Sequence, residues 1–182
     1  MGVYRVMMLL LFALLASVSL AYQQSGEVVS LSGNIDDDMY AAGGEVESVA
    51  RVRGDLVVAG GRLNLEGEVA QDLLAAGGDI RLRGMIRDDA RITGGNLQVQ
   101  AGIRDDLIAA AGRIRLADST MVGGELRLAG GEAVLGGRLF GPVHVSAGRV
   151  VIDGSIETDV EIWAEQVEVR PGALVKGNLL YH

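Results

Sequence analysis

An aspartate that recurs every 17 residues constrains the fold of this chain more than any other feature. It is found at Asp38, Asp55, Asp72, Asp89 and Asp106. The same place in the repeat then falls at Glu125, Pro142, Asp159 and Asn178. Two of the later steps are 19 residues long, and both carry their extra residues at the same point, in LADSTMVGGE (116–125) and VRPGALVKGN (169–178). A fixed period of this length indicates stacked units that share one core and tolerate insertions at a corner.

Within each unit, apolar and polar residues alternate. Counting the acidic position as one, positions two and four are apolar in nearly every unit, while position three holds residues such as Arg91, Arg127 and Glu161. This alternation indicates a strand with positions two and four facing inward. Positions nine, eleven and fifteen are apolar too, so each unit should form three short strands and three corners. We therefore expect an all-β protein, a parallel β-solenoid of about nine triangular coils, right-handed by the usual preference of parallel crossovers.

Position eight supports a stack in strict register. It reads Glu45, Arg62, Asp79, Asn96, Arg113, Glu132, Arg149 and Gln166. Neighbouring coils never place like charges against each other in this column, as side chains that face one another across paired strands require. We expect a ladder of polar and ionic contacts along this side of the solenoid.

A pair of glycines occupies positions six and seven of most units. Examples are Gly43-Gly44, Gly60-Gly61, Gly77-Gly78, Gly94-Gly95 and Gly130-Gly131. A strand followed by glycines resembles the start of a phosphate-binding loop. Such a loop is built once, before a helix, whereas this pair recurs in register with no helical pattern after it. We interpret the pair as a coil corner, where glycine supplies backbone angles closed to other residues and lets neighbouring coils approach. No cofactor is expected.

The aspartate column has two interpretations. Stacked carboxylates at Asp38, Asp55, Asp72, Asp89 and Asp106 are a candidate ladder for a divalent cation such as calcium. The glycine-and-aspartate nonapeptide of calcium-binding β-rolls is absent, however. Aspartate at the start of a strand also caps exposed backbone N–H groups. We favour the structural role, and expect no metal site.

Composition and charge exclude several functions. The chain carries a formal net charge of −8, which disfavours binding to nucleic acid. It has no cysteine and only two histidines, His144 and His182. No Ser/His/Asp set or metal-ligand spacing is found, and the coils leave almost no loops to carry catalytic groups. We therefore expect a protein that is not an enzyme.

The N-terminus has the pattern of an export signal. Arg5 supplies a positive charge, an apolar run follows from Val6 to Leu15, and Ser19-Leu20-Ala21 offers a small-x-small cleavage site. We expect residues 1–21 to be a signal peptide and residues 26–182 to form a single β-helix domain. The protein would then lie in the periplasm or cell envelope, and it would be anchored in the membrane if the segment is not cleaved.

Apolar residues at outward positions and at the C-terminal end are candidates for self-association. Position three carries Tyr40, Val57 and Leu74 on one side of the first coils, and the chain ends with Leu179, Leu180 and Tyr181 inside a coil. Open ends of a solenoid present unpaired backbone and apolar core, the usual template for adding another chain. End-to-end assembly into a homopolymer is the expected mechanism.

The repeats resemble those of the bactofilins, the polymer-forming cytoskeletal family. The resemblance rests on GDLVVAGGRLNLEG (54–67), QDLLAAGGDIRLRG (71–84) and DDLIAAAGRIRLAD (105–118), and covers roughly residues 26–180. It implies a right-handed triangular β-helix that polymerises end to end without a nucleotide, often near the membrane. Bactofilins proper are cytoplasmic and have polar tails, so an export signal would make this chain an envelope-associated relative, with membrane or cell-wall components as possible partners.

A binding module is the alternative function. A monomeric, exported solenoid would use one flat side to hold a glycan or a protein partner. The aromatic residues that stack on sugars are nearly missing, because Trp163 and Tyr40 lie many coils apart. The size of the purified protein distinguishes the two functions.

Overall fold

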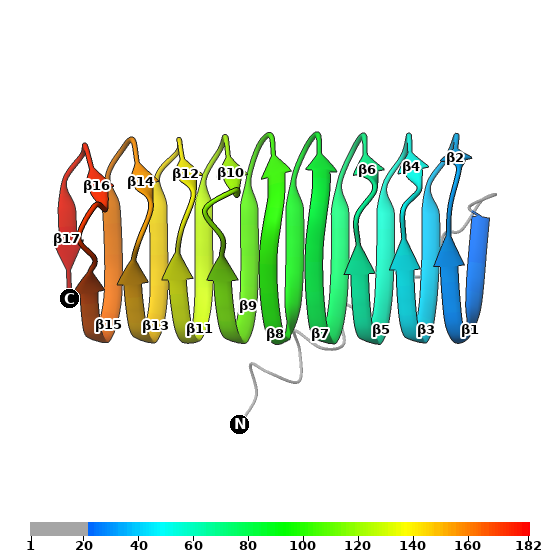
Figure 1. Cartoon of the computed structure of the whole chain (residues 1–182), viewed down its shortest axis with the longest axis horizontal. Coiled ribbons are helices and arrows are strands. Elements are labelled where there is room, and N and C mark those ends of the chain that lie inside the picture. The colour runs from blue at the N-terminus through cyan, green and yellow to red at the C-terminus, as the bar shows by residue number, and fades with distance from the viewer. Residues whose placement is uncertain (1–21) are drawn as a thin grey trace, which may run out of the picture.

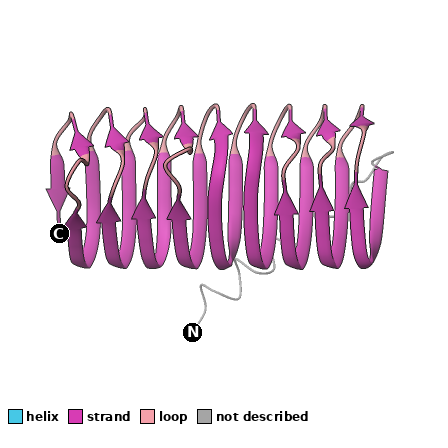
Figure 2. Cartoon of the chain, viewed as in Figure 1, coloured by secondary structure: helices cyan, strands magenta, loops and turns pink. Residues whose placement is uncertain are grey.

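Long and short strands pair in parallel into one 17-stranded sheet that winds as a β-solenoid (Figure 1). This computed structural model describes residues 22–182, so the signal segment expected at 1–21 lies outside the described residues. Figure 2 shows only strands and loops over the described range. The prediction of an all-β parallel solenoid is confirmed, whereas its handedness stays a prediction.

Each coil contributes one long strand that forms its first and second sides. These strands are β1 (Tyr22–Leu31), β3 (Met39–Ser48), β5 (Leu56–Leu65), β7 (Leu73–Ile86), β8 (Ala90–Ile103), β9 (Leu107–Leu116), β11 (Leu126–Leu135), β13 (Val143–Ile152) and β15 (Val160–Val169). Short strands form the third side: β2 (Asn34–Ile35), β4 (Arg51–Val52), β6 (Glu68–Val69), β10 (Met121–Val122), β12 (Arg138–Leu139), β14 (Ser155–Ile156) and β16 (Leu174–Val175). The last strand, β17 (Leu179–Tyr181), begins a further coil.

The register of the sheet follows the sequence repeat. Met39 pairs with Leu56, and Leu73 pairs with Ala90, each 17 residues further along. Across the first insertion Leu107 pairs with Leu126, because the additional residues form a turn before β10. Thr120, which is fully buried, fastens this turn to the preceding coil by donating its hydroxyl to the carbonyl of Val99 at 2.7 Å. The expectation that both insertions bulge at one corner is confirmed.

The expectation of three separate strands in each coil is wrong. The first and second sides form one continuous strand, and in β7 and β8 this strand extends over the third side as well. Backbone pairing does not stop at the glycine corner, since Gly43 pairs with Gly60 and Gly60 with Gly77. A residue without a side chain lets the strand bend there while the ladder to the next coil continues.

The sequence predicts two roles for the paired glycines, unusual backbone angles and close approach of neighbouring coils. Only the second role is confirmed. Among the described residues, positive φ occurs at Gly33, Gly84, Gly137 and Gly172, none of which lies at position six or seven of the repeat. The pairs are needed for space instead. A Cβ at Gly60 would lie 2.6 Å from the carbonyl oxygen of Gly43 in the preceding coil, and one at Gly77 would lie 2.8 Å from that of Gly60. Close approach of neighbouring coils, not an unusual backbone angle, therefore selects glycine.

The inward positions form one continuous apolar core. Met39, Leu73, Ala90 and Leu107 at position two have no exposed surface. Small and large residues compensate between positions two and four, as in Leu73 with Ala75 and Ala90 with Ile92, which are all buried. Close packing of this kind keeps the diameter of the solenoid constant from coil to coil.

Candidate functional site

The aspartate column is a ladder of hydrogen bonds between coils. The carboxylate Oδ1 of each aspartate accepts the backbone N–H of the next residue in the column. The donor–acceptor distances are 2.9 Å from Asp55 to Asp38, 3.0 Å from Asp72 to Asp55, 3.2 Å from Asp89 to Asp72 and 3.1 Å from Asp106 to Asp89. Glu125 continues the ladder by donating its N–H to Asp106 at 2.6 Å. In these bonds the aspartates cap backbone N–H groups, as the sequence predicts.

Two glycines that directly precede a residue of the column, Gly54 and Gly124, leave room for this carboxylate. A Cβ at Gly54 would lie 2.3 Å from Oδ1 of Asp38, and a Cβ at Gly124 would lie 2.3 Å from Oδ1 of Asp106. The backbone supplies the other bonds of this corner, since the N–H of Met39 donates to the carbonyl of Asp55 at 2.8 Å. Side chain and backbone together therefore fix the spacing between coils at this corner.

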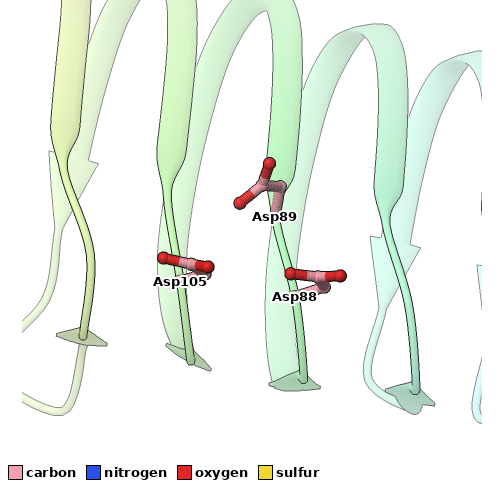
Figure 3. Close-up of side chains that lie close together, drawn as sticks. All are labelled: Asp88, Asp89 and Asp105. Atoms are coloured by element: carbon pink, nitrogen blue, oxygen red, sulfur yellow. The ribbon is translucent and has the colours of Figure 1, made fainter.

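Three carboxylates gather where the ladder passes from β7 to β9. One oxygen each of Asp88, Asp89 and Asp105 lies within 4.8 Å of the others, and Figure 3 shows them on adjoining coils. Of the candidate metal ladder, only Asp89 belongs to this group. Its oxygens are already engaged, one by the N–H of Asp106 at 3.1 Å and the other by Arg91 at 2.8 Å. The group is thus an acidic edge built partly from capping residues.

Desolvation, together with crowding of negative charge, shifts two pKa values. Desolvation, followed by the charges of Asp38, Asp72 and Asp88, raises the pKa of Asp55 above its ordinary 3.8, although the N–H of Asp72 acts in the opposite direction. Desolvation and the neighbouring carboxylates of Asp106, Asp89 and Asp88 likewise raise the pKa of Asp105. Like charges on neighbouring coils therefore make this edge electrostatically unfavourable when it is fully ionised.

A second polar network occupies the first side near the C-terminal end. Pro142 takes the column position after Glu125 and has no N–H, so the Glu125 carboxylate turns to Arg127 at 2.7 Å and His144 at 3.2 Å. The other ring nitrogen of His144 lies 3.5 Å from Glu161, and His182 lies 3.3 Å from the same carboxylate. The His182 ring stacks on Trp163 with centroids 5.1 Å apart. This network joins the last coils and was not expected from the sequence.

The C-terminal end exposes residues at positions that are buried in every coil from β3 to β13. Val169, Leu179 and Tyr181 occupy positions eleven, two and four, yet they are 52%, 43% and 53% exposed. Strand β17 covers only Val160, Glu161 and Ile162 of β15, so within the described residues the second half of β15 has no strand on its outer side. Leu180, which points outward, is also exposed. The predicted self-association residues Leu179, Leu180 and Tyr181 thus form an apolar surface at this end.

The N-terminal end is different. Val29 and Leu31 of β1 are buried, and Gln24 at position four is polar. Within residues 22–182, β1 pairs with β3 alone, so its outer edge has free backbone groups. The C-terminal end of the described solenoid thus presents apolar side chains and free backbone groups, whereas the N-terminal end presents mainly free backbone groups.

The remaining predicted association residues lie side by side on the first side. Tyr40 pairs with Val57 and Val57 with Leu74, and all three are half-buried. Arg91 follows Leu74 in the column and interrupts the apolar stripe. The structure therefore brings these three residues together, but far along the chain from Leu179, Leu180 and Tyr181.

Arginines line a shallow groove on the second side, over β7, β8 and β9. Side chains of positions eight and ten form its walls: Asp79, Arg81, Asn96, Gln98, Arg113 and Arg115. Arg113 pairs with Glu132 at 3.1 Å, as the alternation at position eight predicts, and Asn96 donates to Asp79 at 2.9 Å. Arg115 forms no ion pair with any described residue, and Arg81 contacts only the amide oxygen of Asn64, at 3.4 Å. The groove is locally positive.

Two valines depart from the alternation on this side. Val134 and Val151 occupy position ten, which faces outward, yet they are only 5% and 2% exposed. Around them Arg149 pairs with Glu168 at 2.6 Å, and Arg170 pairs with Asp153 at 2.6 Å. Ion-paired long side chains cover apolar surface with their stems. A run of valine at an outward position beside alternating charges was the signal available in the sequence.

Family models, curated proteins and solved structures show no match to this chain. Nor do the described residues include a helix long and apolar enough to cross a membrane. The geometry of the solenoid itself therefore carries the functional argument.

Proposed function

We propose that this protein is a non-enzymatic structural protein that assembles end to end into an envelope-associated polymer. The observation that carries the proposal is the C-terminal end, where Val169 of β15 and Leu179 and Tyr181 of β17 occupy core positions but are about half exposed. Apolar side chains at core positions are stabilised when another coil covers them. A second copy of the chain supplies such a coil.

Backbone pairing adds to this apolar contact. The outer edges of β15 and β1 carry N–H and C=O groups that have no partner strand among the described residues. An open edge with regular strand geometry is a template for strand addition, and edges at both ends allow growth beyond a dimer. Assembly by this route needs neither nucleotide nor metal.

The resemblance of the repeats to bactofilins supports the same proposal. Units such as QDLLAAGGDIRLRG (71–84) form most of a coil in a stack with regular register, as a polymer-forming β-helix requires. The envelope location rests on the signal pattern of residues 1–21, and it is tested by locating the protein in fractionated cells. Recovery in the cytoplasmic fraction would contradict the envelope location and leave the assembly mechanism standing.

Sedimentation velocity and negative-stain electron microscopy of the purified protein test the assembly. We expect filaments whose length rises with protein concentration. Leu179→Asp combined with Tyr181→Asp should give monomers, because burying a charge at this contact is costly. Val49→Asp is the matched control, since Val49 is 64% exposed but lies on a coil far from the C-terminal end.

Two outcomes would contradict end-to-end assembly. One is a wild-type protein that remains a monomer at high concentration, which would favour the monomeric binding module instead. The other is a double variant that forms the same filaments as the wild type and the Val49→Asp control. Circular dichroism of each variant verifies that the solenoid is intact.

A further inference from the structure

Charge is distributed unevenly around the circumference of the solenoid. The corner between the third and first sides carries the acidic edge: Asp55, Asp72, Asp88, Asp89, Asp105 and Asp106. The second side of the same coils carries Arg62, Arg81, Arg83, Arg113 and Arg115. In a three-sided coil, the second side lies opposite the corner where the other two sides meet. The middle of the solenoid is therefore negative along one edge and positive on the opposite side.

Four exposed charged side chains on these two surfaces form no ion pair within residues 22–182. Asp88 and Asp105 are exposed and form no ion pair there, although Asp72 and Asp89 both pair with Arg91. On the opposite side Arg115 is exposed without a carboxylate partner, and Arg81 reaches only the amide of Asn64. One carboxylate oxygen each of Asp88, Asp89 and Asp105 lies within 4.8 Å of the others, so an approaching cation would relieve repulsion at this edge.

The two surfaces match each other along the axis. Asp88 and Arg81 belong to the same coil, and Asp105 lies one coil further on, between the levels of Arg81 and Arg115. Asp88 and Asp105 are one coil apart, about 4.8 Å along the axis, and Arg81 and Arg115 are two coils apart with Gln98 between them. A second copy with the same axial direction, moved sideways without rotation, therefore sets its acidic edge against the arginine groove of the first.

We propose that copies of this chain associate laterally, with Asp88 and Asp105 of one copy against Arg81 and Arg115 of the next. The contact is heterologous, because an edge meets a different surface, so a pair of copies retains one free edge and one free groove. Heterologous contacts that do not close into a ring continue indefinitely. Lateral association thus produces sheets of parallel solenoids.

Ionic strength should control this association. A single exposed ion pair contributes little, and only an array of several such pairs along the coils holds two copies together. Screening acts over about 30 Å at 0.01 M salt but about 3 Å at 1 M. Sheets are therefore expected at low salt and should dissociate at high salt. The contact uses the middle coils alone, so it is independent of the end-to-end contact at Leu179 and Tyr181.

Charge reversal and mixing test the proposal. One variant carries Arg81→Glu and Arg115→Glu, and the other carries Asp88→Lys and Asp105→Lys. Sheets, observed by negative-stain microscopy and by pelleting at about 0.01 M salt, should be lost in each variant alone, with the pelleted fraction falling about tenfold. An equimolar mixture should restore them, since the glutamates of one variant then meet the lysines of the other.

Several results would overturn the proposal. They are wild-type protein that forms no sheets at low salt, either variant pelleting like the wild type, or a mixture of folded variants that fails to associate. Loss of wild-type sheets on adding EDTA would also overturn it, because a bridging divalent cation would then hold the acidic edges together. The double variant at Leu179 and Tyr181 should still pair laterally, which separates failure of this contact from failure of the proposed filament.

Discussion

The carboxylate of Asp38 accepts the backbone N–H of Asp55, at 2.9 Å, across 17 residues of sequence. Because this bond repeats from coil to coil, each aspartate caps the N–H of the next one and also places a negative charge beside it. Capping stabilises the fold, whereas the like charges destabilise it. Separating them by substitution is the most direct test of the role assigned to the aspartate column.

Asp55→Ala and Asp55→Asn should differ in stability. Alanine leaves the N–H of Asp72 without its acceptor and should lower the free energy of unfolding by about 1 kcal/mol. Asparagine keeps an acceptor oxygen and removes repulsion from Asp38 and Asp72, so it should remain within about 0.5 kcal/mol of the wild type at neutral pH. Urea unfolding measures both, and equal losses in the two variants would contradict the capping role.

The dependence of stability on pH should have opposite signs at two sites. The pKa of Asp105 is raised in the folded chain. Its favourable contribution to the free energy of unfolding is therefore present below the ordinary pKa of 3.8 and is lost as pH rises through the pKa of the folded chain. The pKa of Glu125 is lowered by its hydrogen bond to Arg127, so its contribution is present above 4.5 and is lost as pH falls through the folded value.

Asp105→Asn should accordingly raise the melting temperature at about pH 7, and Glu125→Gln should lower it. Both differences should shrink toward zero at about pH 2, where each carboxyl is protonated in the folded and the unfolded chain. Thermal unfolding followed by circular dichroism across this range checks the signs. Shifts in the same direction at neutral pH would be inconsistent with the two environments.

Gly60→Ala should destabilise the solenoid where Gly26→Ala does not. The new methyl group at residue 60 would lie 2.6 Å from the carbonyl oxygen of Gly43, and relieving that contact should cost about 1–3 kcal/mol. At residue 26, in the same column of the first coil, the nearest atom lies 3.5 Å away, which is an ordinary contact. Similar unfolding midpoints for the two variants would contradict the role assigned to close approach.

Leu73→Ala and Leu179→Ala compare one column position inside the stack and at its end. Leu73 has no exposed surface, so truncation should leave a cavity and cost about 2–5 kcal/mol. Leu179 is 43% exposed, so the same change should cost less than about 1 kcal/mol in the monomer. For filament formation we expect the opposite order, with the larger loss in Leu179→Ala, because only Leu179 lies at the proposed contact. Chemical denaturation and filament counting measure the two effects separately.

Most of the fold could be predicted because a 17-residue period fixes register, and register fixes which residues face inward. Buried Leu73 and Ala75, paired Arg113 and Glu132, and the carboxylate of Asp72 on the next coil's N–H all follow from column position. The continuous bend of each long strand could not be predicted, since a glycine pair is compatible with a break or a bend. Three-dimensional coordinates distinguish these cases.

The candidate surfaces were less accessible to sequence reasoning. The repeat predicts which residues lie next to each other along the axis of the solenoid. The positive charge of the groove at Arg81 and Arg115 depends instead on which arginines lack a carboxylate partner at another repeat position. The network of His144, Glu161 and His182 also joins side chains through rotamers that a repeat does not specify. Alternation alone assigns Val151 to solvent, whereas it is only 2% exposed and lies beside the ion pair of Arg149 and Glu168.

Pro142 divides the capping ladder into two separate runs. It offers no N–H to Glu125 and no side-chain acceptor to the N–H of Asp159, so capping stops at Glu125 and resumes between Asp159 and Asn178. In a stack where each coil contacts only its neighbours, opening proceeds coil by coil and begins where an interface is weakest. Amide hydrogens of β15 and β17 should therefore exchange with solvent deuterium as one group, ahead of the amides from β3 to β11. The single proline of the column thus marks a fraying boundary, and the surface proposed to join copies lies on the side that opens first.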